Sequence, residues 1–141
     1  MSSFTEKKVA PLAPTKEPLM KGFQGKADDK ATPRSSYEVV VSTGDIPGAE
    51  TDGDVWLSVN GSKGKSQWLY LDTSKNNFER GSTDYFYFDL PDLGTLNAAW
   101  IYFRPLGDYP EWYLNNVIVN GKVFAHYGWL TTEIEVQLRA F

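Results

Sequence analysis

The sequence contains no cysteine, which excludes a disulfide framework, a thiol nucleophile and a cysteine-based metal site. It also contains no apolar run near the ~20 residues of a membrane-spanning helix. Its first residues lack the continuous apolar region of a secretory signal. We therefore expect a protein without a transmembrane segment that is soluble or bound peripherally to a membrane.

Residues suited to catalysis are also scarce. His126 is the only histidine, and the sequence has neither a GxSxG nucleophile motif nor a glycine-rich phosphate loop. We interpret His126 as a structural residue on a closing strand. The sequence therefore predicts a protein that is not an enzyme.

Charge is unevenly distributed along the chain, whose 141 residues have a formal net charge of −4. Residues 1–36 hold seven basic and four acidic side chains, whereas residues 37–141 hold seven basic and fourteen acidic ones. An acidic domain repels the phosphates of a nucleic acid. We therefore expect no nucleic-acid partner.

The first 36 residues contain four prolines and only isolated apolar residues. Such a segment cannot bury enough surface to offset an ordering entropy of about 1–2 kcal/mol per residue, so alone it is expected to be an intrinsically disordered arm. Two interpretations stay open: a solvated tail, or an arm that becomes ordered on a partner. In the second interpretation the arm is anchored by Leu19, Met20 and Phe23.

From Tyr37 onward, short β-rich segments alternate with turns of Gly, Asp, Asn and Pro. This pattern is typical of an antiparallel β-sandwich. We expect an all-β domain over residues 37–141, with eight strands in two four-stranded sheets. The expected strands are 37–43, 54–60, 66–71, 83–90, 96–104, 112–119, 122–126 and 132–138.

Alternation within these strands predicts which side chains enter the core. For the first, second and last strands, the inward residues are Tyr37, Val39, Val41, Val55, Leu57, Val59, Ile134, Val136 and Leu138. Trp112 and Leu114 are expected in the core as well. Asn120-Gly121 between two apolar runs predicts a tight hairpin, because both central residues of its turn require positive φ.

Several segments, taken together, resemble one family. The opening strands read YEVVVSTGDIPGAETDGDVWLSV and the central loop reads NNFERGSTDYFYF, followed by DLGTL, EWYLNNVIV and YGWL. This order, from Tyr37 to Leu138, resembles the PLAT domains of lipoxygenases, polycystins and a clostridial toxin. The resemblance implies a calcium-tuned module that docks its host on membranes or on a protein partner, without chemistry of its own. It also implies that lipoxygenase activity is absent, since that activity needs an iron-bearing domain with several histidines.

Two loops of the predicted sandwich carry oxygen donors that suit calcium, which takes six to eight oxygen ligands. The candidate ligands are Thr51, Asp52, Asp54, Asn76, Asn77 and Glu79. All but Asp54 match ligand positions of the family. Glu50 and Asn77 depart from the residues that are common there. The alternative interpretation is that these are turn residues with solvated carboxylates.

Outward aromatic residues are the candidates for binding a partner or a membrane. If Phe86, Phe88, Ile101 and Phe103 point inward, alternation turns four rings outward, namely Tyr85, Tyr87, Trp100 and Tyr102. An exposed aromatic patch favours a binding surface. The alternative is that these rings cover one another or are capped by the arm. The resemblance adds apolar loop-tip residues for membrane insertion, here Trp129, with Leu106 and Tyr109 on a neighbouring loop.

Arg80 has a structural interpretation. Its planar guanidinium suits a buried carboxylate, and we expect Asp84 to be that partner.

Two functions follow from these observations. The first is a peripheral module that docks on a lipid surface or a protein partner and is modulated by calcium. The second is a structural accessory subunit of a larger membrane-associated complex, held by its arm and its outward aromatic residues.

Overall fold

The computed structural model describes residues 33–141, which form ten β-strands. The strands are β1 (Arg34–Thr43), β2 (Asp54–Gly61), β3 (Gly64–Lys65), β4 (Leu69–Tyr70), β5 (Thr83–Pro91), β6 (Leu96–Arg104), β7 (Trp112–Val119), β8 (Lys122–Leu130), β9 (Ile134–Gln137) and β10 (Arg139–Ala140). Within this part of the chain, no helix is long and apolar enough to cross a membrane.

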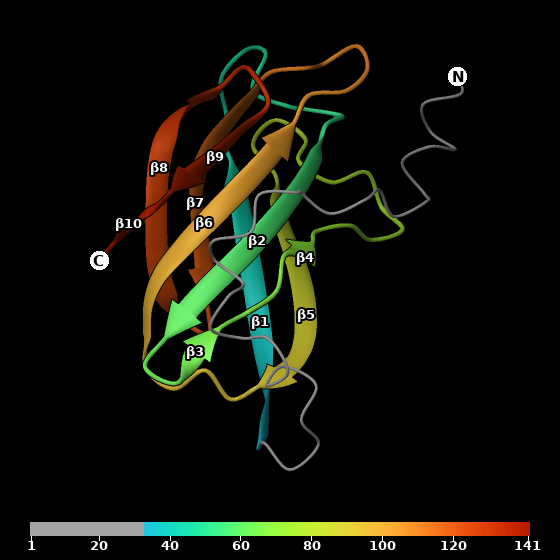
Figure 1. The fold of residues 1–141 in the computed structure, drawn as a ribbon. Helices are drawn as coiled ribbons and strands as arrows, with labels where there is room; N and C mark the ends of the chain where they lie inside the picture. The colour runs from blue at the N-terminus through green and yellow to red at the C-terminus, as the bar shows by residue number, and fades with distance from the viewer. Residues whose placement is uncertain (1–32) are drawn as a thin grey trace.

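The strands form two antiparallel sheets that face each other (Figure 1). The first has the order β10-β8-β7-β1-β5 and is called the β1 sheet here. The second has the order β3-β2-β6-β9, with β4 paired to β2, and is called the β2 sheet. The predicted all-β antiparallel sandwich is therefore confirmed, with five strands in each sheet in place of four.

The additional strands come from two segments. The predicted strand 66–71 pairs only over Leu69–Tyr70, and the hairpin before it contributes Gly64–Lys65. The predicted strand 132–138 divides into β9, paired to β6, and β10, paired to β8. Between them lies Leu138, which is buried and donates its N–H to the carbonyl of Ala99. The end of the chain therefore passes from one sheet to the other, which alternation alone does not reveal.

This crossing changes which residues of the last strand enter the core. The prediction for Ile134 is wrong, because its side chain is 39% exposed. Val136 is only partly buried, and Leu138 is enclosed. The physical reason is that β9 lies at the edge of the β2 sheet, where the outermost residue has little of the facing sheet above it.

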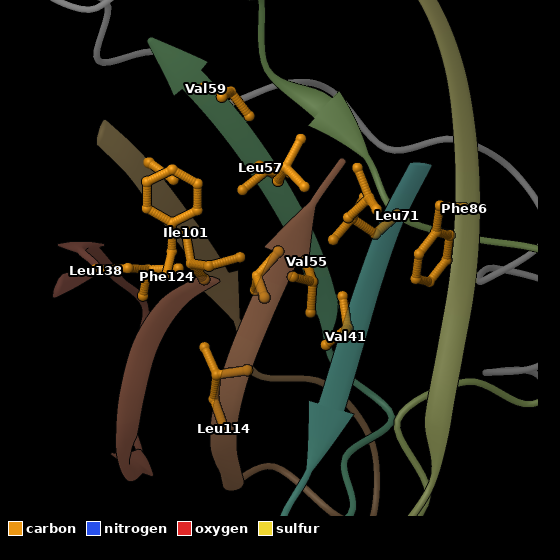
Figure 2. Packing of buried hydrophobic residues seen from close by; sticks show 14 of the residues in the cluster. Val41, Val55, Leu57, Val59, Leu71, Phe86, Ile101, Leu114, Phe124 and Leu138 are labelled. Carbon is orange, nitrogen blue, oxygen red and sulfur yellow. The ribbon is translucent and has the colours of Figure 1, made fainter. Parts of the chain in front are cut away.

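The core lies between the inner faces of the two sheets (Figure 2). All the expected core residues of β1, β2 and β7 are buried, namely Tyr37, Val39, Val41, Val55, Leu57, Val59, Trp112 and Leu114. Burying one such apolar side chain stabilises the fold by about 1.5–3 kcal/mol. Because a one-residue slip would turn all of them to solvent, these residues also fix the register of the strands.

The Asn120-Gly121 hairpin forms as predicted between β7 and β8. Its two residues have φ values of 46° and 85°, and Val119 pairs directly with Lys122. The Asn120 side chain accepts a hydrogen bond from the Glu38 N–H at 2.7 Å and donates one to the Ser36 carbonyl at 3.1 Å. The turn is thereby fastened to β1.

Two glycines allow the cost of a strained backbone to be distinguished from the cost of a steric clash. A Cβ at Gly121 would meet no atom within 4 Å, whereas one at Gly61 would lie 2.1 Å from the Leu93 carbonyl oxygen. Gly121→Ala should therefore cost about 1–2 kcal/mol, the penalty of a left-handed backbone. Gly61→Ala should cost more, because backbone must move. Urea unfolding measures the loss in the free energy of unfolding of each variant. Equal losses for the two variants would contradict this packing.

Candidate functional site

Three long loops meet at one end of the sandwich, at the top of Figure 1. We call residues 44–53, 71–82 and 105–111 the loop end. Backbone hydrogen bonds join these loops: the N–H of Thr51 donates to the Phe78 carbonyl at 3.1 Å, and that of Asp52 donates to the Tyr109 carbonyl at 3.1 Å. The loop end is therefore one connected structure.

Asp84 holds the second loop in place from inside the protein. Its side chain is fully buried and accepts hydrogen bonds from the Phe78 N–H and the Ser82 hydroxyl, both at 2.9 Å. Phe78 has a φ of 65°, a conformation that non-glycine residues rarely adopt. The bond to Asp84 stabilises this turn.

The predicted partner of Arg80 is wrong. Its Nε donates to Asp45 at 3.0 Å, and both side chains are largely exposed. Asp84 points instead at the turn that follows Asn77, where the Phe78 N–H and the Ser82 hydroxyl satisfy it. Lys75 Nζ approaches its carboxylate at 3.7 Å. Arg80 thus links two loops at the surface rather than pinning one from the core.

Half of the six candidate calcium ligands are engaged elsewhere. The buried Thr51 hydroxyl donates to the Tyr109 carbonyl at 2.8 Å and accepts from the Gly53 N–H at 3.0 Å. Asp54 accepts from the Tyr70 hydroxyl at 2.8 Å on the outer face of the β2 sheet. The side-chain amide of the buried Asn77 lies 3.0 Å from the Thr73 hydroxyl.

The other three candidates do not form an acidic cluster. Asp52 and Glu79 are half-buried and Asn76 is exposed. Glu79 has interactions of its own. Among residues 33–141, no three His, Cys, Asp or Glu side chains gather closely enough to hold a metal ion. The described residues therefore do not fit a preformed calcium site built from the six candidates.

The Asp54–Tyr70 bond has an electrostatic consequence. Burial raises the pKa of the Tyr70 hydroxyl far above its usual value, and the hydrogen bond to Asp54 raises it further. Tyr70 therefore stays protonated and keeps donating to Asp54. One oxygen of the Asp54 carboxylate is therefore occupied by this bond.

Apolar side chains project from the loop end. Trp129 is 42% exposed, Tyr109 is 50% exposed and Ile46 is 38% exposed. Leu106 is half-buried. The residues named from the sequence thus lie at one end of the sandwich, joined by Ile46. Trp129 is not on a loop tip as expected, because β8 continues to Leu130 instead of ending at residue 126. From here on, the loop end includes Trp129.

Trp129 rests on a support that the sequence did not indicate. Its ring packs edge-on against Tyr113, with ring centroids 5.3 Å apart. Tyr113 in turn lies over Gly44, where a Cβ would be only 2.6 Å from the ring. A Cβ at Gly48 would lie 3.8 Å from the Trp129 ring. In the sequence, the only signal of this packing was the pair Gly44 and Gly48 in one loop, because glycines leave room for rings to pack against the backbone.

The outward residues of the two sheets differ in exposure. Tyr85 and Tyr87 on β5 are 51% and 69% exposed. Tyr85 pairs across the β1 sheet with Val40, and Val40 pairs with Ile118, so these three side chains share its outer face.

Trp100 and Tyr102 are half-buried within a cluster on the outer face of the β2 sheet. We call this cluster the aromatic face; its members are Trp56, Trp68, Tyr70, Trp100 and Tyr102. Tyr102 donates to Glu133 at 2.5 Å. This hydrogen bond, followed by burial, raises the pKa of the Tyr102 hydroxyl. These outward rings largely cover one another, as one of the two interpretations expected.

His126 is half-buried next to the loop end. Burial lowers the pKa of its imidazole, and a hydrogen bond to the Trp129 backbone partly offsets this effect. The expected arm anchors Leu19, Met20 and Phe23 lie outside the described residues.

The profile of the PLAT/LH2 domain family matches residues 37–138, which confirms the resemblance. Human lipoxygenase homology domain-containing protein 1 is 39% identical over 85 residues, which are 60% of this chain and 4% of that protein. Mouse polycystin-1-like protein 3 is 35% identical over 96 residues, which are 67% of this chain and 4% of that protein. This chain therefore spans a small fraction of the relatives it matches.

Solved structures show the same fold. Coral 8R-lipoxygenase, described as activated by calcium through a C2-like domain, aligns with a TM-score of 0.67 and 27% identity. The alignment covers 75% of this chain and 17% of the lipoxygenase. The catalytic part of that enzyme lies outside the region of similarity.

The engaged ligands predict weak calcium binding. A site that calcium fills only halfway stabilises a protein by about 0.4 kcal/mol, which raises the Tm of a domain of this size by no more than about 3 °C. We expect a rise within this limit at millimolar calcium, measured by calorimetry with magnesium as control. A rise several times larger that Asp52→Asn abolishes would show a preformed site and contradict the geometry.

Proposed function

This chain belongs to the PLAT/LH2 domain family, and we propose that it is a non-catalytic module that docks on a lipid surface through its loop end. The observation that supports this most directly is the exposed Trp129 ring, held on Tyr113 beside the exposed Tyr109 and Ile46. Rings with an apolar body and a polar edge favour the membrane–water interface.

The charges of the loop end determine the kind of lipid. Its three loops hold seven acidic and two basic side chains. Of these, Asp45, Asp108 and Glu111 are exposed, and Asp45 is paired with Arg80. Anionic headgroups would be repelled by these carboxylates, so the proposal specifies zwitterionic lipids. Calcium acts here as a modulator that screens these carboxylates, in keeping with the calcium activation described for the coral lipoxygenase. Docking itself does not depend on it.

A second candidate is a structural accessory subunit that binds a protein partner. The observation that favours it is the apolar row of Tyr85, Val40 and Ile118 on the outer face of the β1 sheet, with Tyr87 exposed beside it. Exposed tyrosines on a rigid sheet are typical of protein interfaces. This surface lies on a sheet face and not at the loop end, so the two candidates can be tested separately.

Substitution of Trp129 tests the lipid-docking proposal. Burying a large apolar side chain contributes about 1.5–3 kcal/mol, so Trp129→Ser should weaken binding about tenfold or more. Binding is measured by flotation with phosphatidylcholine vesicles, with and without calcium. Tyr87→Ser is the matched control, because Tyr87 is at least as exposed but lies on β5, which β7 and β1 separate from the β8 strand that carries Trp129.

Equal binding of both variants and the unsubstituted protein would contradict docking through the loop end. Failure of the unsubstituted protein to bind vesicles, together with loss of co-purifying proteins only in Tyr87→Ser, would favour the accessory-subunit candidate instead. Thermal unfolding of each variant confirms that a loss of binding is not a loss of the fold.

A further inference from the structure

The outer face of the β2 sheet carries aromatic rings where a solvated sheet normally carries polar side chains. Trp56 packs against Tyr70 with ring centroids 5.4 Å apart and against Tyr102 at 5.9 Å. Trp68 packs against Tyr102 at 5.9 Å. With Trp100 packed beside them, these rings form one cluster, in which Trp56 and Trp68 are buried and Tyr70, Trp100 and Tyr102 stay partly exposed.

Two buried polar atoms on this side of the sandwich lack partners. Trp68 is 9% exposed, and its Nε1–H donor has no hydrogen-bond partner among residues 33–141. The Oε1 acceptor of Glu135 is also buried with no hydrogen-bond partner in the described part of the chain, and Glu135 pairs with Tyr102 across β9 and β6. A buried polar group without a hydrogen bond destabilises a fold. This side of the sandwich therefore has hydrogen-bonding capacity that the described residues do not use.

The rings already bind cations from the same face. Arg104 lies 4.9 Å from the centre of the Trp56 ring, and Lys65 lies 5.0 Å from that of Trp100. Carboxylates surround the rings, namely Asp54, Asp72, Glu133 and Glu135. The face therefore suits a basic segment with a few apolar side chains.

We propose that the aromatic face is the docking site of the chain's own amino-terminal segment, residues 1–32. That segment lies outside the described residues, and its sequence holds six lysines, four acidic residues and the apolar Leu19, Met20 and Phe23. The apolar residues can pack against the partly exposed Tyr70, Trp100 and Tyr102, and the lysines can pair with the surrounding carboxylates. The acidic charge of residues 37–141 attracts the segment at short range.

The segment is long enough for this contact. The described chain begins at Pro33, whose carbonyl accepts from the Asp92 N–H at 2.8 Å at the end of the sandwich opposite the loop end. Phe23 lies ten positions before Pro33, and ten extended residues span about 33–36 Å. This reach is comparable to the length of the longest strand, β1, with ten residues. The contact leaves the loop end free, so it is independent of lipid docking.

Paramagnetic broadening in the full-length chain tests the proposal. Because the sequence has no cysteine, Lys21→Cys attaches a nitroxide at one position. The five tryptophan indole N–H signals report on the aromatic face (Trp56, Trp68, Trp100), the core (Trp112) and the loop end (Trp129). We expect loss of the Trp68 and Trp100 signals, recovery on reduction of the nitroxide, and retention of the Trp129 signal.

Controls distinguish the chain's own amino-terminal segment from other possible occupants of the aromatic face. Lys16→Cys, labelled in the same way, checks that the result does not depend on one position, and a label at Tyr87→Cys on the β1 sheet should spare Trp68 and Trp100. Similar attenuation of all five signals, or strongest attenuation of Trp129, would overturn the proposal. So would attenuation that persists when the nitroxide and the isotope are on different molecules, because the occupant would then be a second copy of the chain.

Discussion

The packing of the Trp112 ring beneath the loop end is the contact on which the rest of the site depends. The ring lies 5.1 Å from the centre of Phe78 and 5.7 Å from that of Phe103, and its Nε1–H donates to the Thr43 hydroxyl at 3.0 Å. These contacts join β7, β6, the end of β1 and the loop before β5. The second loop, through Phe78, and the start of the first loop, after Thr43, are thereby fixed to the core.

The sequence was informative wherever a local pattern decides the structure. Alternation placed Val39 and Leu57 inside, and the turn chemistry of Asn120-Gly121 predicted its hairpin, because both depend on neighbours close in the chain. It was not informative where distant segments compete for one partner. Asp84 is taken by the Phe78 N–H, which leaves Arg80 to Asp45. Only the folded path of the loop reveals this.

The candidate site was predicted in part for the same reason. Trp129 and Tyr109 do lie at one end of the sandwich, since Tyr109 is in the loop that leads into β7 and Trp129, near the end of β8, pairs with Tyr113 at the start of β7. Thr51 and Asp54 match or neighbour ligand positions of the family in sequence, yet their oxygens bind Gly53 and Tyr70. A pattern of oxygen-bearing residues shows which ligands are available, but the hydrogen bonds of the folded loops decide which are free.

The central claim is that a rigid sandwich presents its loop end to a lipid surface. It is tested most directly by amide chemical shifts recorded with and without phosphatidylcholine nanodiscs. Our account predicts changes confined to residues 44–53, 105–111 and 127–131, around Trp129. Changes centred on Tyr85 and Tyr87, or spread evenly over both sheets, would contradict it.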